Sequence, residues 1–251
     1  MLRAPSTVRR GRGLRRRFFV AAFDADRAVL TGEAAHHLGR VLRAEPGQLY
    51  ELSDGKSVRL AKIAFSGPER VEFSLLDPVP VRLSPLEKTL LMAVVKFDAF
   101  EWALEKATEL GVNRIVPLAA ARSEKGLLAA ARKRAARWER ILFEASQQSR
   151  RVSLPVMEEV AKPEPAFGRE AARVKIMLSE RAAARPLREI LANGAAASVV
   201  LAVGPEGGWT DQELAAARQA GFEEASLGPL ILRTETAVTA CLAAANFALE
   251  P

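Results

Sequence analysis

Residues 201–242 read LAVGPEGGWTDQELAAARQAGFEEASLGPLILRTETAVTACL, and this stretch decides the fold. An apolar run over residues 198–203 leads into it and has the composition of a strand buried in a parallel sheet. Glycines then dominate residues 204–208, where they let the backbone turn and approach a ligand closely. Thr210 and Glu213 have the spacing of a capping box, which predicts that a helix begins there.

A second loop of the same kind follows this helix. A short strand predicted over residues 225–227 runs into Gly228-Pro229-Leu230-Ile231-Leu232-Arg233. Thr234 is expected to cap the last helix, in which apolar residues recur at helical spacing. Loops at the carboxyl ends of parallel strands are where open α/β sheets bind ligands. The two loops therefore predict a ligand site, although a single glycine loop can equally well be a plain turn.

Outward from this stretch, strands and helices alternate. Further strands are predicted over residues 89–95, 114–118 and 174–178, and helices over residues 98–110 and 123–150. This alternation indicates a parallel sheet with helices on both faces.

The chain before residue 85 has a different rhythm. Short β-rich runs follow one another, and Asp54-Gly55 between two of them is a strong hairpin signal. Such a pattern favours a small β-barrel. Three prolines at positions 78, 80 and 85 indicate a linker near residues 77–86. We therefore expect three parts: a basic tail over 1–17, a β-barrel over 18–84 and an α/β domain over 85–251.

The positive charge of the chain is concentrated in its first residues. The formal net charge is +7, and residues 1–17 contain seven arginines and no acidic residue, which leaves 30 basic and 30 acidic residues elsewhere. The tail is interpreted as a flexible phosphate-binding arm, a targeting segment or an over-extended start.

Other composition features exclude whole classes of protein. The single cysteine, Cys241, excludes an internal disulfide and is expected to be a core thiol rather than a nucleophile. No apolar run approaches the ~20 residues that span a bilayer, so no membrane association is expected. No zinc-ligand spacing or Walker loop occurs, so no metal is expected.

Three motifs resemble one family. GPEGG-x4-E followed by LGPLILRTETA is similar to the knotted SPOUT methyltransferases, and most similar to the RsmE family, which methylates N3 of a uridine in 16S ribosomal RNA. KFDAFEWALEKATELGVNRIVPLAAARSEKG, residues 96–126, is the second motif, and a Gln-Ser-Arg segment follows it at residues 148–150. The third is HHL-x2-VLR at residues 36–43, which resembles part of that family's PUA-like RNA-binding barrel.

The resemblance implies a fold, a cofactor and partners. The C-terminal domain would be a knotted SPOUT-type parallel sheet, preceded by the small PUA-like barrel. It would use S-adenosyl-L-methionine, act on 16S ribosomal RNA or the small ribosomal subunit in the cytoplasm, and form a homodimer through the C-terminal domain. Two alternatives remain open: a SPOUT methyltransferase for another base or for ribose, and a noncatalytic RNA-binding assembly factor.

Site residues follow from the loops and from the resemblance. The expected cofactor-binding residues all lie at three strand ends: Leu178, Ser179, Val203, Gly204, Pro205, Glu206, Gly207, Gly208, Leu227, Gly228, Leu230 and Leu232. Removal of the N3 proton of uridine needs a base or a group that stabilises the anion over O2 and O4. Two catalytic candidates serve these needs: Arg233 and Glu206. The expected RNA-binding residues are Arg40, Arg43, Arg122, Gln148 and Arg150.

Each catalytic candidate also has an ordinary explanation. Glu206 is expected to hold its loop through backbone N–H groups, with the role of base as the alternative. Arg233 can donate two hydrogen bonds to the uracil oxygens, or it can simply pair with Glu235.

Overall fold

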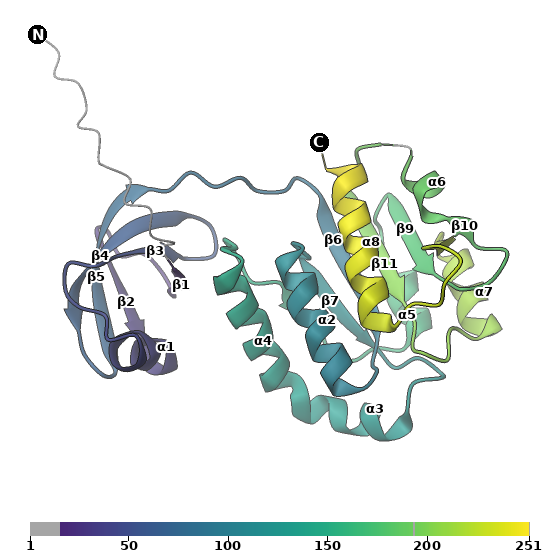
Figure 1. Ribbon diagram of the computed structural model, residues 1–251, viewed down its shortest axis with the longest axis horizontal. Coiled ribbons are helices and arrows are strands. Elements are labelled where there is room, and N and C mark those ends of the chain that lie inside the picture. Colours follow the sequence, from purple (N-terminus) through teal and green to yellow (C-terminus); the bar gives the residue numbers. More distant parts are fainter. Residues whose placement is uncertain (1–15, 193, 251) are drawn as a thin grey trace, which may run out of the picture. The chain divides into compact units, whose positions relative to one another are not determined.

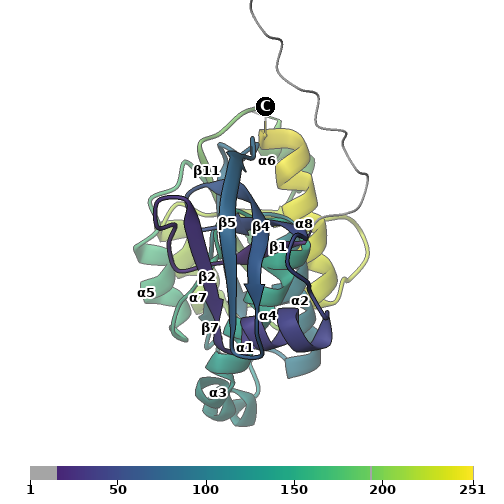
Figure 2. The ribbon, with the colours of Figure 1, turned by 90° about the vertical axis from the view of Figure 1, so that its left-hand side faces the viewer.

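The computed structural model describes residues 16–192 and 194–250, and the chain divides after Pro80 into two compact units. Figures 1 and 2 show the elements of both units.

The first unit is built on one five-stranded sheet with the order β1-β3-β4-β5-β2. Its strands are β1 (Arg17–Phe19), β2 (Arg27–Thr31), β3 (Leu49–Ser53), β4 (Val58–Ser66) and β5 (Arg70–Pro78). Helix α1 (Gly32–His36) and the π-helical turn η1 (His37–Val41) follow β2. Strands β1 and β2 remain as edges, so the predicted barrel is a curled half-barrel rather than a closed one (Figure 1).

The hairpin predicted at Asp54-Gly55 is confirmed. Strands β3 and β4 pair in antiparallel fashion on either side of it. The Asp54 carboxylate accepts hydrogen bonds from the backbone N–H groups of Lys56 and Ser57 at 2.9 and 2.8 Å, which closes the turn.

Arg17 belongs to the sheet and not to the tail. It lies opposite Glu51 in the register of β1 and β3, and its Nη2 donates to Glu51 Oε2 over 2.9 Å. Only 6% of the Arg17 side chain is exposed, so its charge is buried against that carboxylate. The tail predicted over residues 1–17 is therefore too long at its end, and residues 1–15 lie outside the described residues.

The second unit contains a seven-stranded parallel sheet with the order β10-β12-β9-β11-β6-β7-β8. The strands are β6 (Glu87–Ala93), β7 (Arg114–Leu118), β8 (Val156–Met157), β9 (Val174–Leu178), β10 (Arg185–Pro186), β11 (Ser198–Val203) and β12 (Glu223–Ser226). The five predicted strands are all present. The two missed strands, β8 and β10, lie at the two edges of the sheet and contain only two residues each. Strands this short show no alternation of apolar and polar residues that could be recognised in the sequence.

Helices cover both faces of this sheet, as predicted. They are α2 (Phe97–Glu109), α3 (Lys125–Ala131), α4 (Ala135–Gln148), α5 (Pro163–Gly168), α6 (Leu187–Leu191), α7 (Asp211–Gln219) and α8 (Thr234–Leu249). A 3-10 turn, η2 (Arg132–Arg134), separates α3 from α4, so the helical region expected over 123–150 is two helices. Figure 2 shows α5 and α7 on one side of the unit and α2, α4 and α8 on the other.

Alternation along the central strand explains the two layers. In β11, Val199, Leu201 and Val203 pack into the core beneath α2, α4 and α8, whereas Val200 and Ala202 face the core beneath α5 and α7. Successive side chains of a strand point to opposite faces, so a strand buried on both faces needs an unbroken apolar run.

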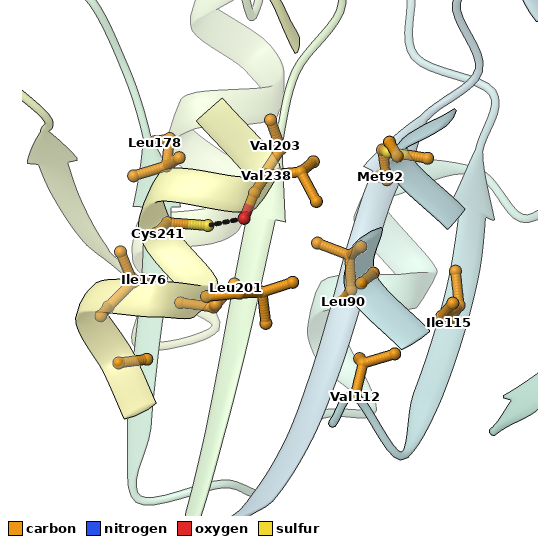
Figure 3. Close-up of a cluster of buried hydrophobic side chains, with 14 of the residues drawn as sticks. Leu90, Met92, Val112, Ile115, Ile176, Leu178, Leu201, Val203, Val238 and Cys241 are labelled. Atoms are coloured by element: carbon orange, nitrogen blue, oxygen red, sulfur yellow. Dashed lines mark hydrogen bonds between the residues drawn. The ribbon is translucent and has the colours of Figure 1, made fainter. Parts of the chain in front are cut away.

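Cys241 lies inside the first of these cores (Figure 3). Its side chain is fully buried, its Sγ donates to Val238 O over 3.3 Å, and burial raises the pKa of the thiol to about 12. The prediction of a core thiol is confirmed.

Within residues 16–192 and 194–250, none of the helices combines the length and the apolar composition that a bilayer crossing requires.

Candidate functional site

Three loops enclose a cavity of about 340 Å³ at the carboxyl ends of β9, β11 and β12. These strands are neighbours in the sheet, so their loops emerge side by side. All twelve residues predicted to bind the cofactor line this cavity. Arg122, Arg181, Trp209 and Thr234 also line it.

The glycine loop after β11 is a tight turn. Gly208 N donates to Pro205 O over 2.8 Å, and Gly208 has a φ of +68°, which glycine adopts without strain. Arg122 braces the loop from outside because its Nη1 donates to Gly207 O over 2.7 Å and to Trp209 O over 3.2 Å. The loop is therefore held by Arg122, which was predicted to contact RNA.

Glu206 does not hold this loop. Its side chain is exposed, and in the described part of the chain its carboxylate accepts no hydrogen bond. The loop-holding role expected for Glu206 is wrong, because backbone and Arg122 contacts already satisfy the turn. Glu206 instead presents a charged group without a protein partner at the rim of the cavity.

Trp209 was missed by the sequence reasoning, and it fixes two of the three loops to each other. Its Nε1 donates to Leu178 O, at the end of β9, over 2.9 Å, and its ring packs edge-on against Phe167. A Cβ on Gly204 would meet the Trp209 indole at 3.0 Å, so only glycine leaves room for this ring. The sequence Gly207-Gly208-Trp209 could have indicated this role, because a large apolar ring directly after a glycine turn must pack close to that turn.

The capping box predicted at the start of α7 is confirmed and has a second role. Thr210 Oγ1 accepts from Glu213 N, and Glu213 Oε2 accepts from Thr210 N over 2.8 Å. The other carboxylate oxygen, Oε1, accepts from Ala121 N over 2.8 Å. Glu213 thus ties the segment that carries Arg122 to the helix behind the glycine loop.

Thr234 does not cap the last helix as predicted. The N-cap of α8 is Arg233, and Thr234 is the first helical residue. The Thr234 hydroxyl donates to Gly204 O over 3.1 Å and so joins the loop after β12 to the glycine loop after β11. The Thr234 hydroxyl therefore bonds to a distant loop and not to the backbone of its own helix. The sequence alone does not distinguish these two partners.

The loop after β9 is held by a carboxylate behind the cavity. Ser179 Oγ donates to Glu224 Oε1 over 2.7 Å, and Arg218 donates to Glu224 Oε2 over 2.8 Å. Burial raises the pKa of Glu224, but these hydrogen bonds and the charges of Arg218 and Arg181 outweigh it and lower the pKa below its ordinary value. Ser179 Oγ also accepts from Arg181 N over 3.2 Å, so this hydroxyl links its own loop to Glu224.

The third loop, after β12, is the most exposed of the three. Leu230 and Ile231 each expose 78% of their surface, which is unusual for large apolar side chains. Arg233 is exposed at the end of this loop, and in the described part of the chain it forms no ion pair with Glu235. Its guanidinium is therefore available to a ligand.

The other residues predicted to contact RNA lie away from the cavity. Gln148 is the last residue of α4 and Arg150 lies two residues beyond it, where the neighbouring Arg151 donates to Thr108 O near the end of α2. Neither lines the cavity. Arg40 and Arg43 are exposed in the first unit, in and just after η1.

Among the described residues, histidine, cysteine and carboxylate side chains form no group of three that could hold a metal ion.

Comparison with known proteins assigns the family. Residues 82–246 match the RNA methyltransferase domain family and residues 30–76 the RNA methyltransferase PUA domain family. The chain is 35% identical to ribosomal RNA small subunit methyltransferase E of Synechocystis sp., over 88% of this chain and 73% of that protein, and 34% identical to the same enzyme of Mycobacterium bovis, over 86% and 85%.

A solved structure agrees. The crystal structure of ribosomal RNA small subunit methyltransferase E from Neisseria gonorrhoeae, bound to S-adenosyl methionine, superposes with a TM-score of 0.85 at 32% identity, covering 94% of this chain and 98% of that one. The family resemblance of the three sequence motifs is thereby confirmed. The chain belongs to the RNA methyltransferase family, among the relatives named ribosomal RNA small subunit methyltransferase E.

Proposed function

We propose that this chain transfers a methyl group from S-adenosylmethionine to N3 of a uridine in small-subunit (16S) ribosomal RNA. The observation that carries the proposal is the cavity at the ends of β9, β11 and β12, which all twelve predicted cofactor residues line. Its volume, about 340 Å³, lies in the range of small-molecule sites, roughly 300–1,000 Å³.

The lining of the cavity fits this cofactor. Leu178, Val203 and Leu227 supply apolar walls for a purine ring, and the tight glycine turn lets backbone groups approach it. The cofactor, when bound, supplies a methyl group already activated by its positive sulfur. The protein therefore has to orient the acceptor, exclude water and manage one proton.

Two side chains suit the management of that proton: Glu206 lines the cavity, and Arg233 lies in the third loop between Leu232 and Thr234, which both line it. The imide N3–H of uridine must lose its proton before the nitrogen lone pair can attack the methyl carbon. Glu206 has a carboxylate without a protein partner in the described chain, so it is the assigned proton acceptor. Arg233 has a free planar guanidinium, which can donate two hydrogen bonds to the negative charge on O2 and O4.

The remaining assignments follow the family. Residues 18–84 would act as the RNA-binding domain, and residues 85–251 as a knotted catalytic domain that forms a homodimer. Exposed apolar side chains on the second unit support dimer formation: Trp102, Leu230, Ile231 and Phe247. A ribosomal substrate would put the protein in the cytoplasm. Sedimentation equilibrium tests the dimer, and a concentration-independent monomer mass would refute it.

A methylation assay tests the proposed function. Small-subunit particles from cells that lack the modification are incubated with the protein and methyl-labelled S-adenosylmethionine, and the nucleosides are separated by mass spectrometry. We expect label in N3-methyluridine. Label on another base or on a ribose oxygen would contradict N3 of uridine as the methyl acceptor. RNA binding without any methyl transfer would favour a noncatalytic assembly factor.

A further inference from the structure

The corner where α3 meets α4 concentrates positive charge. Residues 124–140 contain six basic and two acidic side chains, whereas the chain beyond residue 17 is neutral overall, with 30 of each sign. In Figure 1 this corner lies at the lower end of α4.

The basic side chains of the corner are of two kinds. Arg134 and Arg137 both pair with Glu101, at 3.2 and 2.7 Å, and Arg140 pairs with Glu144 at 2.9 Å. These charges are compensated within the protein: Arg134 and Arg137 tie η2 and the start of α4 to α2 through Glu101, and the Arg140–Glu144 pair lies within α4.

Three further side chains have no such compensation. Lys125, Arg132 and Lys133 are exposed, and no residue in the described ranges forms an ion pair or hydrogen bond with their side chains. We call these three residues the basic elbow. Stability of the fold does not explain it, because uncompensated like charges on one short segment repel each other.

The basic elbow lies close to the mouth of the cavity. Arg122 lines the cavity, and Lys125 follows it by three residues, so their Cα atoms are at most about 11 Å apart. Helix α3 rises about 1.5 Å per residue, which places Arg132 only ~10 Å further along. A strand whose target base enters the cavity has neighbouring phosphates within this reach.

We propose that the basic elbow binds the phosphates of the RNA strand next to the target nucleotide. The inference rests on the proposed function and adds an RNA-docking surface to it. Lysine and arginine charges that face solvent attract the RNA backbone without reading its sequence, so they set the position of the strand and not the choice of base. The apolar neighbours Leu127 and Leu128 are packed against the core. The surface that the basic elbow offers to RNA is therefore charged and not apolar.

Salt-dependent RNA binding tests the proposal. The variant K125Q/R132Q/K133Q is compared with the intact protein by anisotropy of a labelled 20-nucleotide single-stranded RNA from 50 to 300 mM salt. Three lost phosphate contacts should reduce the slope of log K against log[salt] by about 2 and weaken binding at 0.15 M salt by roughly 50-fold. Cofactor affinity and melting temperature should stay unchanged.

A matched control separates local contact from bulk charge. The variant R82Q/R173Q/R188Q removes the same charge from three exposed arginines. Arg173 directly precedes β9 and so lies at the amino end of that strand, whereas the cavity lies at the carboxyl ends; Arg82 lies five residues before β6, and Arg188 is in α6. It should keep the original slope. An equal loss in both variants, an unchanged slope in the elbow variant or no RNA binding by the intact protein would overturn the proposal.

The methylation assay distinguishes failure of the inference from failure of the proposed function. Methylation rates of the intact protein and the elbow variant are compared at the same subsaturating concentration of small-subunit particles. If both proteins methylate the particles at the same rate, the elbow proposal alone is wrong. If the intact protein binds RNA with the predicted slope but transfers no methyl group, the proposed function fails and the phosphate-binding surface stands.

Discussion

Replacing Gly204 with alanine should place a methyl group against the indole of Trp209. The new Cβ would lie 3.0 Å from Cε2, 3.1 Å from Nε1 and 3.3 Å from Cδ2 of that ring. The ring has little freedom to move, because it is 7% exposed, packs against Phe167 and donates to Leu178 O. Strain must therefore appear at the junction of two cavity loops.

The size of the effect follows from these contacts. Overpacking a filled site by one methyl group costs about 1–3 kcal/mol. Weakening the Trp209–Leu178 hydrogen bond adds about 1 kcal/mol. A loss of about 2–4 kcal/mol lowers the melting temperature of a chain of this size by roughly 4–16 °C. Because both loops line the cavity, we expect cofactor affinity to fall by roughly 10-fold.

Differential scanning calorimetry and cofactor titration measure the two effects, and a double-mutant cycle tests their cause. In a Trp209→Phe background the smaller ring leaves space for the new methyl group. Gly204→Ala should therefore lower the free energy of unfolding by at least ~1 kcal/mol less in that background than in the intact protein. Gly126→Ala is the control: its Cβ would meet only a flexible Glu124 oxygen at 3.8 Å, and stability should be unchanged or slightly higher. Full stability and affinity in Gly204→Ala would refute the reasoning.

Three further predictions concern single side chains. Arg233→Ala should lower turnover by roughly 100-fold with little change in cofactor affinity, and loss of cofactor binding in calorimetry would contradict a role in anion stabilisation. Burial raises the pKa of Glu250, but hydrogen bonds from Lys88 and Ser84 and the charges of Lys88 and Arg82 outweigh it and leave the pKa below its ordinary 4.5. The stability from this pair is thus present above about pH 4.5 and lost as pH falls through the lowered pKa, so melting of Lys88→Met should depend less on pH in that range. Cys241 should resist alkylation at pH 8 until the chain unfolds, and rapid labelling of the folded protein would disprove its burial.

Much of the second unit could be read from the sequence because its signals are local. The apolar run of β11 must be buried on both faces, and residues 174–178 and 114–118 gave β9 and β7 with the observed bounds. The twelve cavity residues could be predicted because each lies at the end of a buried strand or in the loop that follows it, and because these loops resemble those of a known family. Strands β8 and β10 escaped detection because pairing with a longer neighbour, not composition, makes them strands.

The parts that failed depend on contacts between distant segments. Thr234 had the composition of a cap, but its hydroxyl reaches Gly204 O across the site. Glu206 was expected to hold a turn that Arg122, 85 positions away, holds instead. Arg17 looked like part of a basic tail until Glu51 provided its counter-charge in the sheet. No local pattern encodes such pairs.

Cofactor titration most directly tests the assignment of the three-loop cavity. Gly207 lies in the glycine loop and its Cβ would point at Arg122, 3.2 Å from that residue's Cβ, so Gly207→Trp puts a large ring at the cavity rim. We predict saturable binding of S-adenosylmethionine to the intact protein and to Gly126→Trp, and none to a folded Gly207→Trp variant. Equal binding by all three proteins, or no binding by the intact protein, would contradict the account.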